Sequence, residues 1–184
     1  MITTHNQLKW DIRFLLMAAH VASWSKDPST TTGAIITKKK QLISAGYNGL
    51  PQGVEDTYER LNNRELKYSM INHCERNAIV LAQRDITGCT LYTWPFMSCS
   101  VCSGVVVQSG ISRVVAPLNN NPRWVDSFKL STEIFTEAGV EIVLVDPKNI
   151  PTLVINPPVE PEPVVLPTEF NSTWKWTEPS TWFR

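Results

Sequence analysis

The sequence predicts an α/β protein in which helices cover both faces of a central mixed sheet of about five strands. The chain has 184 residues and 42% of them are hydrophobic, enough for one domain of roughly 150 residues with a buried core. Segments typical of strands alternate with segments typical of helices, as in three-layer α/β/α folds. No run approaches the roughly 18 apolar residues that would cross a membrane, so we expect a soluble protein.

The first half of the chain is expected to contain a helix, a hairpin and a second helix. Apolar residues recur at helical spacing over residues 7–24, and a polar, proline-containing segment ends that helix. Two β-rich runs follow within residues 33–49. Three lysines at residues 38–40 form the turn between them, and we interpret these lysines as solvated. A polar connector then leads to a helix that begins near residue 72.

The second half of the chain continues the alternation of strands and helices and completes the five strands. The expected elements are, in order, a strand over 88–94, a helix from the cysteines to Gly110, a strand over 111–118, an amphipathic helix over 123–139 and a strand over 140–146.

Residues 147–184 differ in composition from the domain expected over residues 1–146. Eight of the 13 prolines and three of the 7 tryptophans lie in this last segment, where no helix or sheet is expected. One interpretation is an extended, polyproline-like tail. The other is an arm that lies across a neighbouring subunit.

The charges of the chain balance, with 17 basic and 17 acidic residues. A neutral chain has no large positive surface for a long polyanion, so we expect no nucleic-acid partner and favour a small-molecule substrate. The first ten residues lack the charged and apolar regions of a signal peptide. The expected compartment is therefore the reducing cytoplasm, where disulfides are rare.

A histidine and two cysteines form a candidate metal site. His73 alone would suit a structural role, and Cys99-x-x-Cys102 alone would suit redox chemistry or structural zinc. Together they supply three ligands of the type that binds zinc, the number found in catalytic sites with an open fourth position. A closed structural site would need a fourth ligand from Cys74 or Cys89, which we interpret as small core residues.

Glu75, two residues after His73, adds a candidate proton carrier at the start of the same helix. A carboxylate beside zinc-activated water can accept its proton and pass it on. The helix N-termini expected at both motifs would favour ionised thiolates. The alternative is a helix-capping or solvated acid. A histidine, a glutamate two residues later and a downstream Cys-x-x-Cys match the signature of zinc-dependent deaminases.

At these residues the sequence resembles the cytidine deaminase superfamily, and within it the deoxycytidylate (dCMP) deaminases, phage enzymes included. The resemblance runs from Trp10 to Asp146 and rests on "SKDPSTTTGA", "GYNGLPQGVED", "HCERNAI", "SCSVC" and "QSGISRVV". Free-nucleoside and adenosine-editing relatives do not usually carry the second of these motifs. Two positions depart from the usual pattern, with Cys74 in place of alanine and Ser98 in place of proline.

The resemblance implies a cytidine-deaminase-like fold and hydrolysis of dCMP to dUMP and ammonia for thymidylate synthesis. It implies that Glu75 protonates N3 of the ring and then the departing ammonia. It also implies that Asn48 binds the sugar or the base edge, and that the loop with Ser98 approaches the exocyclic amine. Alternatives are another cytosine nucleotide, RNA or single-stranded DNA as the substrate, or a non-catalytic zinc-binding scaffold.

The same resemblance implies a homo-oligomer, a hexamer, that dCTP activates and dTTP inhibits at a subunit interface. The implied effector residues are Lys26, Asp27, Gly46, Tyr47 and Gly49, with Mg²⁺ accompanying the triphosphate. A lysine can pair with phosphate, and glycines let backbone N–H groups approach closely. The alternative is that these residues only form turns.

Arg84 lies nine residues beyond Glu75, at the position that the resemblance associates with the substrate phosphate. On a helix, nine residues correspond to a rotation of about 180° and a rise of about 13 Å, so Arg84 would not reach its own site. It would then act in the site of a neighbouring subunit. The alternative is a solvated arginine at a helix C-terminus.

Overall fold

The computed structural model describes residues 5–152, which contain a five-stranded mixed sheet in the order β2-β1-β3-β4-β5. The strands are β1 Gly33–Lys38, β2 Gln41–Tyr47, β3 Thr90–Trp94, β4 Arg113–Pro117 and β5 Glu141–Val145. β1 pairs antiparallel with β2 and β3, whereas β3, β4 and β5 run parallel. The predicted mixed sheet is confirmed.

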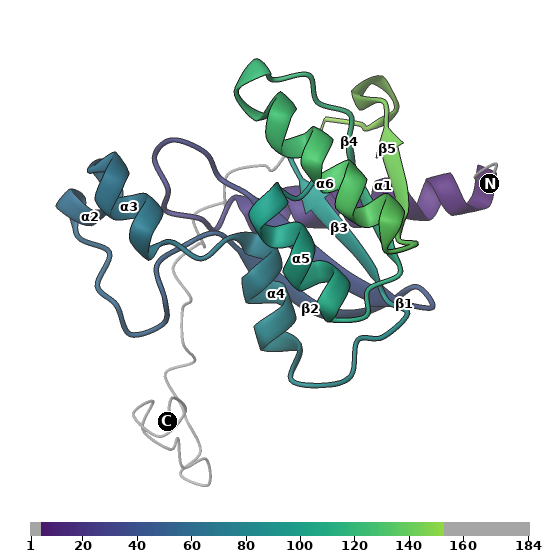
Figure 1. The fold of residues 1–184 in the computed structure, drawn as a ribbon, viewed down its shortest axis with the longest axis horizontal. Coiled ribbons are helices and arrows are strands. Elements are labelled where there is room, and N and C mark those ends of the chain that lie inside the picture. Colours follow the sequence, from purple (N-terminus) through teal and green to yellow (C-terminus); the bar gives the residue numbers. More distant parts are fainter. Residues whose placement is uncertain (1–4, 153–184) are drawn as a thin grey trace, which may run out of the picture. The chain divides into compact units, whose positions relative to one another are not determined.

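Helices cover both faces of this sheet, which confirms the predicted three-layer arrangement (Figure 1). One face packs against α1, and the opposite face carries α4, α5 and α6. The helices on the two faces are α1 His5–Ala22, α4 Cys74–Ala82, α5 Ser100–Gln108 and α6 Val125–Glu137, with a short 3-10 helix η1 Pro122–Trp124 before α6. Among the described residues, no helix is long and apolar enough to cross a membrane.

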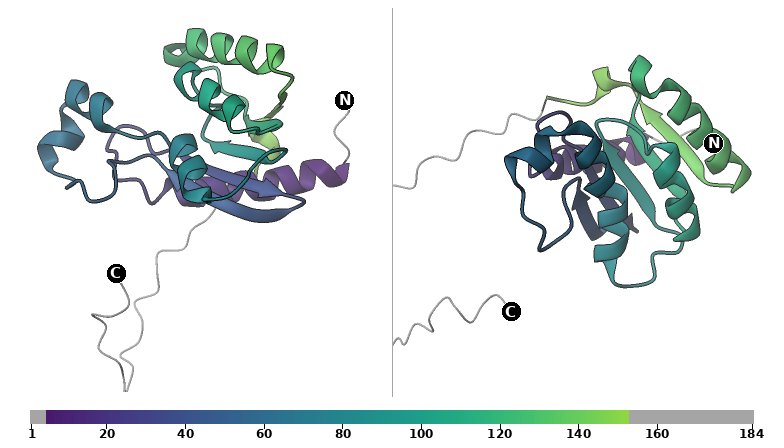
Figure 2. Two further views of the ribbon diagram at one scale, coloured as in Figure 1. Left: turned by 60° about the horizontal axis from the view of Figure 1, so that its bottom comes forward. Right: turned by 60° about the vertical axis from the view of Figure 1, so that its left-hand side comes forward.

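Two short helices occupy the segment that we expected to be a plain connector. They are α2 Tyr58–Asn62 and α3 Arg64–Met70, and they stand to one side of the sheet (Figures 1 and 2). Side-chain caps begin both of them, since Thr57 accepts a hydrogen bond from the Arg60 N–H and Asn63 accepts one from the Leu66 N–H. Helices this short carry too few apolar residues to show a period in the sequence.

The lysine-rich turn has the predicted place and an unusual backbone. Lys39 and Lys40 both lie in the left-handed region, with φ of 50° and 66°. A two-residue hairpin turn of type I′ requires positive φ at both central positions. Lys39 and Lys40 supply these angles without glycine, and the hairpin of β1 and β2 forms as expected.

The predicted tail at residues 147–184 lies outside the described residues, apart from its first few. A short 3-10 helix, η2 Pro147–Asn149, occurs at its start, where no helix was expected. The Asp146 side chain caps it by accepting a hydrogen bond from the Lys148 N–H. The division into a domain over 1–146 and a tail or arm stays a prediction.

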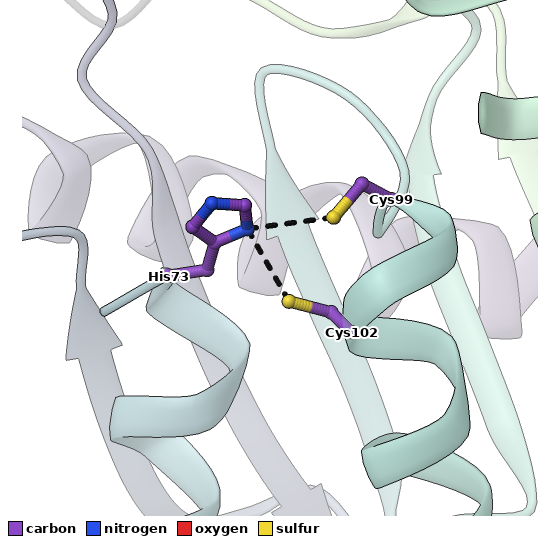
Figure 3. A group of neighbouring side chains, drawn as sticks. All are labelled: His73, Cys99 and Cys102. Atoms are coloured by element: carbon purple, nitrogen blue, oxygen red, sulfur yellow. Dashed lines mark hydrogen bonds between the residues drawn. The ribbon is translucent and has the colours of Figure 1, made fainter. Parts of the chain in front are cut away.

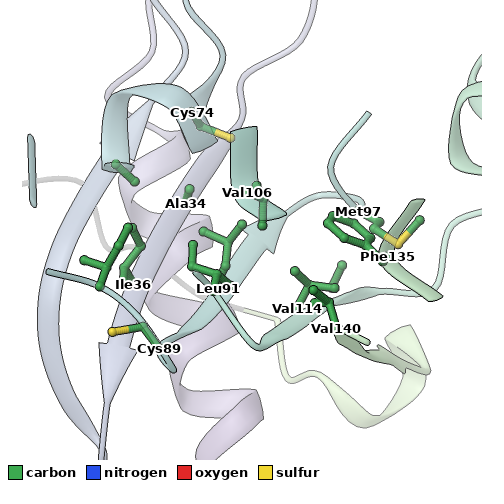
Figure 4. Close-up of a cluster of buried hydrophobic side chains, with 14 of the residues drawn as sticks. Ala34, Ile36, Cys74, Cys89, Leu91, Met97, Val106, Val114, Phe135 and Val140 are labelled. Atoms are coloured by element: carbon green, nitrogen blue, oxygen red, sulfur yellow. The ribbon is translucent and has the colours of Figure 1, made fainter. Parts of the chain in front are cut away.

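Side chains alternate along the strands and form two cores, one on each face of the sheet. Ala34, Ile36 and Leu91 pack under α4, α5 and α6, where Val106 of α5 and Phe135 of α6 are also fully buried (Figure 4). The intervening side chains form the other core against α1, which contains Ile35, Tyr92 and Val115 together with Phe14, Leu15, Ala18, Val21 and Val145. This alternation is the period of two expected for strands buried on both faces.

A close approach between β2 and α4 fixes the position of the helix that carries the site. A Cβ atom at Gly46 would lie 2.4 Å from the backbone nitrogen of Ala78 and 2.6 Å from the carbonyl oxygen of Cys74. Only glycine fits there. The Ser44 hydroxyl donates a hydrogen bond of 2.7 Å to the Ala78 carbonyl on the same helix.

Candidate active site

The candidate metal ligands lie at the N-termini of two neighbouring helices. His73 is the N-cap residue of α4, and Cys99 is the N-cap residue of α5. Neither side chain forms a capping hydrogen bond to its own helix. Both side chains instead face one another across the space between the helices (Figure 3). The loop after β3 and the strand-like segment before α4 therefore position the ligands.

The three predicted ligands come together with the spacing of a metal site. Nδ1 of His73 lies 3.4 Å from Sγ of Cys99 and 3.3 Å from Sγ of Cys102 (Figure 3). All three ligand atoms lie within 4.8 Å of one another. Tetrahedral zinc, with Zn–N of about 2.0 Å and Zn–S of about 2.3 Å, separates nitrogen and sulfur ligands by about 3.5 Å. The donor set and the spacing therefore fit zinc.

The protonation of the two thiols also favours a cation at this position. A hydrogen bond from Cys102, followed by the influence of His73, lowers the pKa of the Cys99 thiol to about 4. The pKa of the Cys102 thiol is raised by the hydrogen bond of this thiol to Cys99 and by its burial. The protein alone thus stabilises one thiolate. A divalent cation supplies the charge that a second thiolate needs.

Glu75 lies in the first turn of α4 and is only 5% exposed. The Cys74 thiol donates a hydrogen bond of 3.3 Å to Oε2 of Glu75. Within the described residues, no ammonium or guanidinium group forms an ion pair with this carboxylate. The N-terminus of α4 favours a negative charge at this position and partly compensates for the burial of Glu75.

A cleft opens beside the cluster and encloses about 620 Å³, including space that is open to solvent. His73, Glu75 and Cys99 form one part of its lining. Four aromatic side chains also line it, namely Tyr68, Trp94, Phe96 and Trp124. A flat aromatic ligand suits such walls, because aromatic rings favour stacked or edge-on contacts.

Asn48 lines the cleft as predicted, and its amide is held by three hydrogen bonds. Its oxygen accepts a hydrogen bond of 2.7 Å from the Thr32 N–H, and its nitrogen donates to the Thr30 carbonyl and to Asp27. Asp27 in turn accepts a hydrogen bond of 2.7 Å from the ammonium of Lys67. Asn48 is therefore fixed in one orientation at the cleft wall.

Ser98 and Arg84 are not part of the cleft lining among the described residues. Ser98 is 1% exposed, and its hydroxyl has no hydrogen-bond partner within the described part of the chain. Arg84 is exposed, just beyond the left-handed Gln83 that ends α4. α4 thus ends two residues before Arg84, and the role of Arg84 in the site of a neighbouring subunit stays a prediction.

The five predicted effector residues differ in their surroundings. Asp27 is buried against Lys67, and Gly46 packs against α4, so both have structural roles. Lys26 is exposed and pairs with Asp56 at 2.7 Å, and Tyr47 is 41% exposed. The backbone of Gly49 exchanges two hydrogen bonds with Asn72 in an isolated β-bridge.

Comparison with known proteins decides the family. A family model described as the cytidine and deoxycytidylate deaminase zinc-binding region matches residues 8–118. The chain belongs to this family. It is thus a zinc-dependent deaminase, and His73, Cys99 and Cys102 form the zinc-binding site typical of the family.

Two similar sequences show how far the likeness extends. An uncharacterized deaminase in the luxG 3' region of Aliivibrio fischeri is 43% identical over 137 residues, which cover 73% of this deaminase and 92% of the relative. The deoxycytidylate deaminase of Mus musculus is 35% identical over 115 residues, which cover 59% of this deaminase and 64% of the mouse enzyme.

Solved structures share the fold of the deaminase. A dCMP deaminase from the cyanophage S-TIM5 in apo form aligns with a TM-score of 0.60 and 20% identity, over 74% of this chain and 98% of that chain. RibD from Acinetobacter baumannii aligns with a TM-score of 0.55 and 22% identity, over 74% of this chain and 35% of that chain. These identities support the fold alone.

Sequence reasoning missed most of the cleft wall. Lys67 and Tyr68 come from the segment taken as a connector, and nothing in its composition signals a buried lysine. Phe96 lies in the loop after β3 and Trp124 in the short 3-10 helix η1, and neither segment is long enough for aromatic residues to show a periodicity. The pair Arg123-Trp124, which follows Asn121-Pro122, could have indicated part of the cleft wall, because large aromatic and guanidinium groups near turns are common at binding sites.

Proposed function

We propose that the chain catalyses the hydrolytic deamination of dCMP to dUMP and ammonia, which supplies dUMP for dTMP synthesis. The observation that carries the proposal is Glu75, a buried carboxylate that lines the same cleft as His73 and Cys99. Burial of a carboxylate without an ion-pair partner costs free energy. A carboxylate that transfers protons to a substrate must lie in the cleft, and this role accounts for the burial of Glu75.

Sequence relatives support a cytosine nucleotide as the substrate. The mouse relative, 35% identical, is a deoxycytidylate deaminase. The cyanophage enzyme of the same fold has a crystal structure in complex with dCMP and dUMP. The walls formed by Trp94, Phe96 and Trp124 suit a planar pyrimidine.

Glu75 moves the protons in this proposal. Zinc, when bound, makes water acidic enough to lose a proton near neutral pH. Glu75 accepts that proton and delivers it to N3 of the ring, while the oxygen of water forms a bond to C4. Glu75 next takes the proton of the new C4 hydroxyl and passes it to the exocyclic amine, and the bond between C4 and that nitrogen breaks to release ammonia. The other carboxylate of the cleft, Asp27, is engaged by Lys67, which leaves Glu75 for this work.

Asn48 and the loop that carries Ser98 are proposed to contact the substrate. The fixed amide of Asn48 lies at the cleft wall, where its oxygen retains one free lone pair for the sugar or the base edge. The loop that carries Ser98 leads directly into the ligand Cys99, so that we assign it to the neighbourhood of the exocyclic amine.

We further propose a homo-oligomer in which Arg84 reaches the cleft of a neighbouring subunit. The neighbouring helices α4 and α5 expose apolar side chains at Val80, Leu81, Val101 and Val105, which are 71%, 57%, 63% and 38% exposed. A second copy covering this face would bury them. Arg84 follows α4 directly and would lie at the edge of such an interface.

Regulation by dCTP and dTTP is also a proposal, and it rests on the accessible members of the predicted effector set. These are Lys26 and Tyr47, since Asp27, Gly46 and the backbone of Gly49 are committed to contacts within the chain. A triphosphate, with Mg²⁺ as its counterion, would replace Asp56 as the partner of Lys26.

An ammonia-release assay on dCMP, CMP, deoxycytidine and dCTP, combined with measurement of the zinc content, tests the proposed function. We expect dCMP to be the best substrate of zinc-loaded protein. Zinc-loaded, folded protein that releases no ammonia from any of the four would overturn the proposal. Equal rates on all four substrates would instead indicate a deaminase of broader specificity.

A further inference from the structure

Arg123 occupies the wall of the active-site cleft, although no feature of the proposed mechanism uses it. It lies in η1, and its Nη2 donates a hydrogen bond to the hydroxyl of Tyr68 in α3. Its guanidinium also lies 5.1 Å from the centre of the Trp124 ring. Two aromatic residues from distant parts of the sequence thus hold one guanidinium beside the cleft.

The positive charge of Arg123 is not neutralised within the described residues. The other cationic side chain of the described lining, Lys67, forms a buried ion pair with Asp27. Arg113, elsewhere in the fold, pairs with Asp11 and Glu141. Arg123 has no such carboxylate in the described part of the chain, so its charge is available to a ligand in the cleft.

The geometry of a guanidinium suits a phosphate monoester. Arginine presents five N–H donors in a planar fork, and the contact with Tyr68 uses one of them. The remaining donors can bind phosphate oxygens in pairs, which strengthens and orients the contact. Stacking against Trp124 limits the rotation of the group and so reduces the entropy that binding would cost.

We propose that Arg123 binds the 5′-phosphate of the nucleotide in the cleft of its own chain, and that Tyr68 orients it. The inference rests on the proposed function and deepens it, because it names a residue that distinguishes a nucleotide from a nucleoside. It differs from the role assigned to Arg84, which lies outside the cleft lining and needs a neighbouring subunit. Arg123 needs no neighbour.

Two pairs of ligands test this role in Arg123→Gln. Steady-state rates on dCMP and deoxycytidine report turnover, and calorimetric titration with dUMP and deoxyuridine reports binding without turnover. We expect the variant to raise the KM for dCMP and weaken dUMP binding by about 10- to 100-fold, the usual effect of losing hydrogen bonds to a charged group. Values for deoxycytidine and deoxyuridine should change little.

Three further variants sharpen the test. Arg123→Lys should restore part of the phosphate affinity, because it keeps the charge and loses the fork. Tyr68→Phe should have an intermediate effect, because it frees the guanidinium without removing it. Arg13→Gln is the matched control, since Arg13 also lies over a tryptophan, at 4.7 Å from the Trp10 ring, but on α1 and outside the cleft lining.

The outcomes separate this inference from the proposed function. Wild-type protein that acts on dCMP, together with an Arg123→Gln variant that keeps its preference for dCMP over deoxycytidine, would overturn the inference alone. If the variant lost equal affinity for the nucleotides and the nucleosides, Arg123 would support the fold or contact the base, and the inference would also be overturned. If the wild type releases no ammonia, the proposed function fails, and the titrations with dUMP and deoxyuridine decide on Arg123.

Discussion

The ammonium of Lys67 lies 2.7 Å from the carboxylate of Asp27, and both side chains are almost fully buried, at 3% and 7% exposure. This ion pair joins α3 to the loop before β1. Asp27 also accepts a hydrogen bond from Asn48, so the pair supports a wall of the cleft.

Removal of one partner of this pair should destabilise the protein. Lys67→Met leaves a buried carboxylate without its cation, and we expect a loss of about 3 kcal/mol in the free energy of unfolding, measured by urea denaturation. The double variant Lys67→Met with Asp27→Asn should recover part of the loss. Lys26→Met removes the exposed pair with Asp56 and serves as the control, with no measurable change expected. Equal effects at Lys26 and Lys67 would contradict the argument from burial.

Glu75→Gln should separate metal binding from catalysis. The amide has nearly the same shape as the carboxylate and cannot accept the proton, so we expect zinc content to stay at the wild-type value while kcat on dCMP falls by roughly two to four orders of magnitude. Metal analysis and ammonia release on the same sample provide both readouts. A variant nearly as fast as the wild type would rule out Glu75 as the proton carrier.

Gly46→Ala should disturb the metal site through packing. The new Cβ would meet the backbone of Ala78 at 2.4 Å and displace α4, at a cost of about 1–3 kcal/mol and with weaker zinc retention. Gly104→Ala is the control, because a Cβ there meets no atom within 4 Å and alanine favours a helix by roughly 0.5–1 kcal/mol. We therefore expect Gly46→Ala to lower both the thermal unfolding temperature and the zinc content. Gly104→Ala should keep the zinc content and should keep or raise the unfolding temperature.

The zinc ligands could be predicted because each of the two motifs that carry them is short and local in the sequence. His73 and Glu75 share one helix N-terminus, and Cys99 and Cys102 share another, so local spacing determines most of the geometry. The five strands were predictable for the same reason, since each is a short β-rich run in the sequence.

The cleft wall could not be predicted, because distant segments form it. Asp27 and Lys67 are 40 residues apart, and Tyr68 and Arg123 are 55 residues apart. Their pairing depends on how α3 and η1 meet in the folded chain, which no short pattern encodes. The lysine of the buried pair lies in a polar segment that also suits a solvated connector.

A mixing experiment tests whether Arg84 completes the site of a neighbouring subunit. Subunits with Glu75→Ala and subunits with Arg84→Glu should each be nearly inactive on dCMP. Mixed oligomers should regain part of the activity, because some clefts then combine an intact Glu75 with an intact Arg84 from the next subunit. Absence of recovery after proven subunit exchange would restrict phosphate binding to residues of one chain.

Effector control should be visible in the shape of the rate curve. With Mg²⁺ present, dCTP should make the dependence of rate on dCMP concentration less sigmoidal, and dTTP should oppose it. Lys26→Gln should raise the dCTP concentration needed for half of the response, whereas Lys9→Gln on α1 should leave it unchanged. Indifference of the wild type to both triphosphates would exclude this regulation.

The two cores of the sheet separate the tasks of the molecule. The buried residues of the core under α1 do not line the cleft, whereas the other core contains Cys74, which does. Trp94 lines the cleft and also packs against the core under α1, so libraries that repack Phe14, Leu15 and Val115 should keep Trp94 fixed if they are to change thermal resistance without changing the cleft. Substitutions in the core against α1 are therefore suited to changing stability, and substitutions on the opposite face are suited to changing the substrate or the reaction.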